Sequence, residues 1–289
     1  MLKIIVDSTC DLPQELLEKY DIKMIPLRVY LGEKEYKDKA TIRVEEVYDA
    51  MRNGITPMTS QPRPSDIKDM FLSFCKDNIA FIYLAFSSAL SCTYQLAQSI
   101  CKELKANYPN MDMEVVDSKG GSLATGLIAL QAAKLAKSGY DFKTIVKQVK
   151  SMVEHIEHIF TITDLKWLIK GGRISKGEGM IGSILDIKPI LDVKNGVMEV
   201  IRKVRGKKKA LNMVADILAE RIKNFPEQVI GISHADDLET VSELVKIIKS
   251  KIGEKAVMIC KIGSVLGSHI GIGGVGIFFL NKKPDLYIK

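Results

Sequence analysis

The N-terminal stretch LKIIVDST, from Leu2 to Thr9, combines an apolar run with a polar turn. The apolar letters Leu2–Val6 are typical of a buried strand. In an open α/β sheet the carboxyl end of a strand faces the ligand crevice, and Asp7, Ser8 and Thr9 would lie there. The stretch therefore predicts an α/β fold and one edge of a binding site.

The same alternation of strands and helices continues through the first half of the chain. It indicates an α/β domain with a largely parallel sheet and flanking helices. The expected strands are Leu2–Val6, Met24–Leu31, Ile79–Phe86 and Met113–Val116. The expected helices are Pro13–Tyr20, Val44–Met51, Ile67–Phe74, Ser91–Leu104, Ser122–Lys137 and Phe142–Glu154.

The second half of the chain has a different pattern, which includes antiparallel pairing. Two apolar runs are joined by Asn195-Gly196, the strongest short-range signal for a hairpin. We expect a mixed sheet with strands at Phe160–Thr163, Val229–Ser233, Ala256–Cys260 and Val275–Leu280, and helices at Leu165–Ile169, Lys208–Ile222 and Leu238–Ile252. The sequence thus predicts two α/β domains, residues 1–156 and 157–289.

Length and composition are those of a soluble globular protein. The 289 residues can form one large or two medium domains, and apolar and charged residues make up 46% and 27% of them. No apolar run approaches the roughly 18 residues of a membrane span, and Asp7 interrupts the first run too early for a signal peptide. Five scattered cysteines form no C-x-x-C pair. We expect a cytoplasmic protein without metal or cofactor.

The stretch GIGGVG, Gly271–Gly276, matches the G-x-G-x-x-G letters of a dinucleotide-binding turn. That motif requires a helix directly after the glycines, because the pyrophosphate rests on the start of that helix. Here the strand-like letters VGIFFL follow instead. We therefore expect the glycines to shape a loop that brings backbone N–H groups and the neighbouring His269 to another ligand.

Three hydroxyl-rich loops precede predicted helices, at residues 7–9, 59–62 and 87–94. The free N–H groups of a helix start favour an anion, and hydroxyl groups add neutral donors. Each loop alone is also explained by helix capping, for which Ser and Thr are preferred. Together with His269, the loops indicate a small anionic head group such as a carboxylate, since no arginine fork for tight phosphate binding accompanies them.

Two other functions use the same residues or the basic run. Ser91, His269 and an acid such as Asp7 are the residue types of a serine hydrolase triad, although the chain lacks a G-x-S-x-G elbow. An esterase or thioesterase is therefore the alternative. The run RKVRGKKK, Arg202–Lys209, is a solvated face or a surface for nucleic acid or an acidic protein. Nucleic acid ranks last, because no aromatic residues for base stacking interleave the run.

The order of several motifs along the whole chain resembles the DegV family of bacterial fatty-acid-binding proteins. The matching stretches are VDST at 6–9, TSQP at 59–62, SSALSCTY at 87–94, VDS at 116–118, LIKGGRIS at 168–175, IKPIL at 187–191, KVRGKKKA at 203–210 and GSVLGSHIGIGGVG at 263–276. Taken together in this order, they are highly specific.

The resemblance implies two α/β domains that enclose one long-chain fatty acid in a hydrophobic tunnel. By similarity, the carboxylate would be held by Thr59, Ser60, Ser91 with the adjoining Cys92 N–H, and His269. The family is understood to present this carboxylate to a separate fatty acid kinase subunit for phospholipid synthesis. On that reading the chain is no enzyme by itself. Residues that would dock the kinase or steady its phosphates are Arg173, Lys203 and Arg205.

Three positions depart from the family pattern. Cys92 stands where glycine is usual, Arg63 where serine is usual and Ile272 where proline is usual. If Cys92 required backbone angles open only to glycine, the implied carboxylate geometry would not apply. The apolar stretch Met180–Leu185 is the expected tunnel wall.

Overall fold

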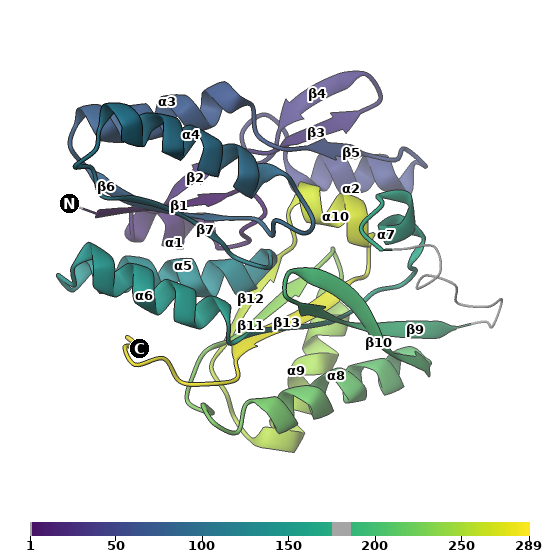
Figure 1. Cartoon of the computed structure of the whole chain (residues 1–289). Coiled ribbons are helices and arrows are strands. Elements are labelled where there is room, and N and C mark those ends of the chain that lie inside the picture. The colour runs from purple at the N-terminus through teal and green to yellow at the C-terminus, as the bar shows by residue number, and fades with distance from the viewer. Residues whose placement is uncertain (1, 175–185) are drawn as a thin grey trace.

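A parallel sheet forms the first half of the molecule, as the sequence predicts (Figure 1). The structure is a computed structural model that describes residues 2–174 and 186–289. The sheet has the order β2-β1-β6-β7, and all its strand pairs are parallel. Its strands are β1 (Leu2–Asp7), β2 (Lys23–Ile25), β6 (Ala80–Ala85) and β7 (Met113–Asp117).

The second half is built on a six-stranded mixed sheet with the order β10-β9-β8-β13-β11-β12. Only β11 and β12 pair in parallel among its described strands. Asn195 and Gly196 both have positive φ and close the β9–β10 hairpin, which confirms that prediction. The strands are β8 (Ile156–Thr161), β9 (Ile187–Lys194), β10 (Val197–Arg205), β11 (Ile230–His234), β12 (Val257–Lys261) and β13 (Val275–Leu280).

Helices lie outside and between the two sheets (Figure 1). The parallel sheet has α3 (Pro64–Lys76) and α4 (Thr93–Asn107) on one face, and α1 (Gln14–Lys19), α5 (Ser122–Lys137) and α6 (Phe142–Val153) on the other. The far face of the mixed sheet carries α8 (Lys207–Arg221) and α9 (Leu238–Ile252). Because α5 contacts both sheets, it is buried on nearly all sides, which matches its apolar sequence. None of the helices in the described ranges is long and apolar enough to cross a membrane.

A third, antiparallel sheet was not expected from the sequence. It has the order β4-β3-β5 and consists of β3 (Arg28–Leu31), β4 (Lys34–Lys37) and β5 (Met58–Ser60). The predicted single strand Met24–Leu31 is wrong, because Pro26 separates β2 from β3 and the two strands join different sheets. Proline lacks the N–H that a continuous strand needs.

Three helices lie beside this third sheet. They are α2 (Val44–Arg52), α7 (Lys166–Lys170) and α10 (Ser264–Ile270). Of these, α10 contacts β3 and β5 and also packs against α2 and α7. His269, which the sequence places beside the glycine loop, belongs to the last turn of α10. The glycine loop is confined to the turn between α10 and β13. Gly271 and Gly273 adopt positive φ in this turn.

The buried carboxylate of Asp11 links the loop after β1 to the starts of two helices, α5 and α10. Asp11, in the loop after β1, accepts hydrogen bonds from the Gly263 N–H at 2.9 Å and from the Ser122 hydroxyl at 2.6 Å. The Lys39 ammonium lies 3.4 Å from the same carboxylate. Burial raises the pKa of Asp11, and the Lys39 charge and both hydrogen bonds oppose that rise. The starts of α5 and α10 are therefore fixed to the loop after β1.

We expect Asp11→Ala to lower the free energy of unfolding by about 3 kcal/mol, since it removes the carboxylate that pairs with the Lys39 charge and leaves the Gly263 N–H without its acceptor. Chemical denaturation measures this change. The matched control is Glu103→Ala, which breaks an exposed ion pair with Lys68 and should change stability by less than about 1 kcal/mol. Equal effects of the two substitutions would contradict the role of Asp11.

Candidate functional site

A cavity of about 420 Å³ lies between the third sheet, α4 and α10. Its lining includes Thr59, Ser60, Ser91 and His269, which the sequence places far apart. Thr59 and Ser60 come from β5, Ser91 lies just before α4, and His269 ends α10. We call this the head-group cavity, because it gathers polar groups from separate elements at one place.

His269 is a partly buried titratable group of this cavity. Its Nε2 lies 2.6 Å from Thr59 Oγ1. Burial, together with the Arg173 charge, lowers the pKa of His269 to about 4. At neutral pH the imidazole is therefore neutral and has one donor and one acceptor nitrogen. If Nε2 carries the hydrogen, it donates to Thr59 Oγ1 and leaves the Thr59 hydroxyl hydrogen for a ligand.

Gly171 explains how the His269 ring is held in place. A Cβ atom added at Gly171 would lie 2.2 Å from His269 Nδ1, so the backbone contacts the ring directly. Within the described residues, Nδ1 has no hydrogen-bond partner. The ring is thus positioned by packing on one side and by Thr59 on the other.

Arg28 was missed by the sequence analysis, although it supports the same cavity. Its guanidinium donates to Ser60 Oγ at 2.8 Å and to the Gln61 carbonyl at 2.9 Å. Gln61 also lines the cavity, and its side-chain oxygen has no partner among the described residues. Arg28 pairs with Ser60 across β3 and β5, so only knowledge of that strand register would have revealed it.

Ser91 and Cys92 form the start of α4. The Ser91 hydroxyl lies 2.8 Å from Thr93 Oγ1 and accepts from the Thr93 N–H at 3.2 Å. Cys92 has φ −77° and ψ 7°, which a cysteine adopts without strain, so this departure leaves the implied backbone geometry intact. Its side chain is exposed. Ser91 therefore accepts a hydrogen bond from the first residue of α4 and also lines the head-group cavity.

The groups of a serine hydrolase triad do not come together in the described structure. His269 Nε2 contacts Thr59, whereas the Ser91 hydroxyl contacts Thr93. Asp7 is engaged elsewhere, because it accepts hydrogen bonds from Thr9 and from the Phe86 N–H at 2.7 Å. No acid orients the imidazole as a triad requires, since His269 Nδ1 is unpartnered among the described residues.

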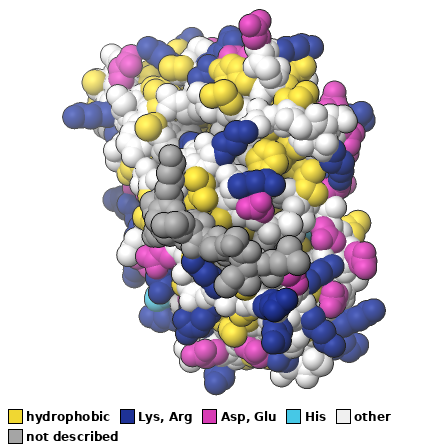
Figure 2. All heavy atoms as spheres, turned by 90° about the vertical axis from the view of Figure 1, so that its right-hand side faces the viewer, with side chains coloured by type: hydrophobic (Ala, Val, Ile, Leu, Met, Phe, Trp, Pro, Cys, Tyr) yellow, Lys and Arg dark blue, Asp and Glu magenta, His cyan; other side chains and the backbone are white. Residues whose placement is uncertain are grey.

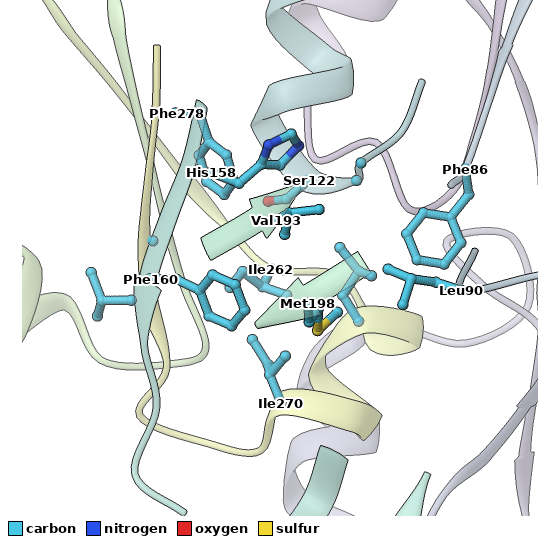
Figure 3. A pocket seen from close by; sticks show the side chains of 15 residues that line it. Phe86, Leu90, Ser122, His158, Phe160, Val193, Met198, Ile262, Ile270 and Phe278 are labelled. Carbon is cyan, nitrogen blue, oxygen red and sulfur yellow. The ribbon is translucent and has the colours of Figure 1, made fainter. Parts of the chain in front are cut away.

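A second, apolar cavity adjoins the head-group cavity. The two share Phe86, Met198, Leu266 and Ile270 in their walls. The apolar cavity has about 540 Å³ of space and is lined almost wholly by aliphatic and aromatic side chains and glycines (Figure 3). The predicted tunnel wall Met180–Leu185 lies outside the described residues.

The remaining predicted residues have different surroundings. Arg173 lines the head-group cavity and donates to the Leu90 carbonyl at 3.1 Å. Lys203 and Arg205 are exposed on β10 and are not among the described residues of the cavity wall. Figure 2 shows Lys and Arg side chains spread over the lower part of one face of the molecule, with Asp and Glu among them. The first hydroxyl-rich loop, residues 7–9, is buried and bonded internally.

Comparison with known proteins decides the family. The model of a family described as uncharacterised proteins, DegV family, matches residues 1–282. The chain belongs to the DegV family. A DegV domain-containing protein of Clostridium perfringens is 37% identical over 285 residues, which cover 98% of both chains.

Several solved structures share the fold. A stearic-acid-binding protein from Eubacterium ventriosum is 27% identical with a TM-score of 0.89, covering 96% of this chain and 97% of its own. A DegV lipid-binding protein from Thermotoga maritima is 30% identical with a TM-score of 0.85, covering 98% and 99%. DegV of Bacillus subtilis, described as a fatty-acid-binding protein, is 29% identical with a TM-score of 0.85, covering 96% and 98%.

Proposed function

We propose that this DegV chain binds a long-chain fatty acid. The observation that supports this most strongly is the junction of a polar and an apolar cavity at α10, where Leu266 and Ile270 border both. A ligand that fills both cavities needs a small polar head and a long apolar tail. The related structures described as fatty-acid-binding proteins support the same ligand class.

The polar cavity suits a carboxylate. Thr59, Ser60 and Ser91 offer hydroxyl groups that can donate hydrogen bonds without adding charge. The neutral His269 imidazole donates to Thr59 Oγ1 and so directs the Thr59 hydroxyl hydrogen to the carboxylate. Arg173 is the cation of the lining and attracts the anion to this end. The Cys92 N–H, at the start of α4, is the further donor that we assign to the carboxylate.

The apolar cavity holds the tail. Each CH₂ group that leaves water contributes about 0.8 kcal/mol, so a long chain gains more from this cavity than its carboxylate gains from the head-group cavity. The tail therefore supplies most of the affinity, and the head group fixes the direction in which the fatty acid enters.

We further propose that the chain is a binding subunit that presents the carboxylate to a separate fatty acid kinase subunit. A surface hollow of about 780 Å³ shares Thr59, Arg173 and His269 with the head-group cavity. Through this hollow a partner can reach the head group from outside. Lys203 and Arg205, exposed on β10, would then contact the partner or its phosphates.

We expect Thr59→Val to weaken stearic acid binding about tenfold, because the change keeps the side-chain shape and removes one hydrogen bond to a charged group. Titration calorimetry or displacement of a fluorescent fatty acid measures the affinity. The control Thr144→Val removes a hydroxyl on exposed α6, bonded to Asp141, and should leave the affinity unchanged. Unchanged binding by Thr59→Val would contradict the assignment of the head-group cavity.

The presentation to a kinase has a separate test. We expect the double substitution Lys203→Glu and Arg205→Glu to keep the stearic acid affinity, since neither side chain lines the described cavity. Formation of acyl phosphate with ATP and a purified fatty acid kinase subunit should fall at least about tenfold, by charge repulsion at the docking surface. A matched control is Lys147→Glu on α6. Equal rates for all three proteins would exclude this docking surface.

A further inference from the structure

The wall of the apolar cavity contains one ionisable side chain, His158 of β8, among the described residues (Figure 3). Its neighbours in the wall are mainly aromatic and aliphatic groups. The Phe278 ring meets the imidazole edge-on, with ring centres 5.9 Å apart. Ser122 also lines the cavity, but its hydroxyl already bonds to Asp11. Among the described polar side chains of this wall, His158 is therefore the one that can still form a hydrogen bond with a ligand.

His158 is buried, and neither ring nitrogen has a hydrogen-bond partner of good geometry among the described residues. Burial lowers the pKa of His158 to about 4, and a hydrogen bond with the Ile156 backbone opposes this shift. The ring is therefore neutral at physiological pH and carries one donor and one acceptor. The Ile156 backbone can engage at most one of the two ring nitrogens, so at least one stays unpaired in the apolar cavity, and a plain hydrocarbon tail does not relieve this.

Packing gives His158 a fixed position with limited freedom to turn. A Cβ atom added at Gly120 would lie 1.9 Å from His158 Nε2, so glycine at this position makes room for the ring. The χ2 torsion of histidine has a broad energy minimum, which allows a modest rotation of the ring toward a ligand atom. Figure 3 shows His158 and Ile270 on opposite sides of the cavity. Since Ile270 also borders the head-group cavity, His158 faces the tail away from the carboxylate.

We propose that His158 recognises a hydroxyl group on the tail of the bound fatty acid, so that hydroxylated long-chain acids are preferred ligands. A hydroxyl group can donate to the bare nitrogen or accept from the protonated one, and a single hydroxyl matches either tautomer. A second carboxylate does not fit, because no cation among the described wall residues would balance its charge. The inference rests on the proposed function, since it assumes that the tail occupies this cavity.

The test compares the affinities of stearic acid, 10-hydroxystearic acid and 12-hydroxystearic acid for the full chain. We expect at least one hydroxy acid to bind about tenfold more tightly than stearic acid, which corresponds to about 1.4 kcal/mol. In His158→Leu this preference should disappear, and stearic acid should bind at least as well as before. Phe160→Leu is the matched control on the same strand and in the same wall, and it should leave the ratio unchanged.

The outcomes separate the two proposals. If the wild-type chain binds stearic acid as tightly as both hydroxy acids, the hydroxyl preference is wrong and fatty-acid binding stands. A preference that survives in His158→Leu also overturns the role of His158. If none of the acids binds, the proposed function fails, and this inference fails with it. The wild-type ratio alone decides the ligand preference even if His158→Leu does not fold.

Discussion

The buried carboxylate of Asp11 is the constraint on which the arrangement of this molecule depends. It binds the start of α10 through the Gly263 N–H and the start of α5 through Ser122, while Lys39 balances its charge. A carboxylate without such partners would not remain ionised in the interior. Because these groups come from both halves of the chain, the two sheets and α10 take their relative positions together.

This constraint connects the fold with the binding site. The helix α10 places His269 against Thr59 of β5, and its residues Leu266 and Ile270 border both cavities. The helix α5 fills the space between the two sheets, since it contacts β1 on one side and β11 on the other. Polar groups thus gather where the third sheet meets α10, and apolar walls extend from there between the sheets.

The sequence predicts the parts of the fold that depend on local patterns. Apolar runs alternating with helical periodicity predict the parallel sheet, and Asn195-Gly196 predicts the β9–β10 hairpin. It does not predict the third sheet, because β3, β4 and β5 are short and their pairing is not local. It also misses α10, where Gly267 lowers the helix signal, although this glycine lets α10 approach Tyr48 closely.

The residues of the candidate site also divide into those that the sequence predicts and those that it does not. Motif resemblance points to Thr59, Ser91 and His269, and the structure brings them to one cavity. Arg28 and His158 carry no such signal, because their roles follow from strand register and from the surroundings of a single side chain.

A crystal structure of the chain with stearic acid tests the central claim most directly. We predict that a carboxylate oxygen lies within hydrogen-bond distance of Thr59 Oγ1, with the tail running past Phe86 and Met198 into the apolar cavity. A fatty acid bound with its carboxylate in the apolar cavity, or a lipid bound elsewhere on the molecule, would contradict this account.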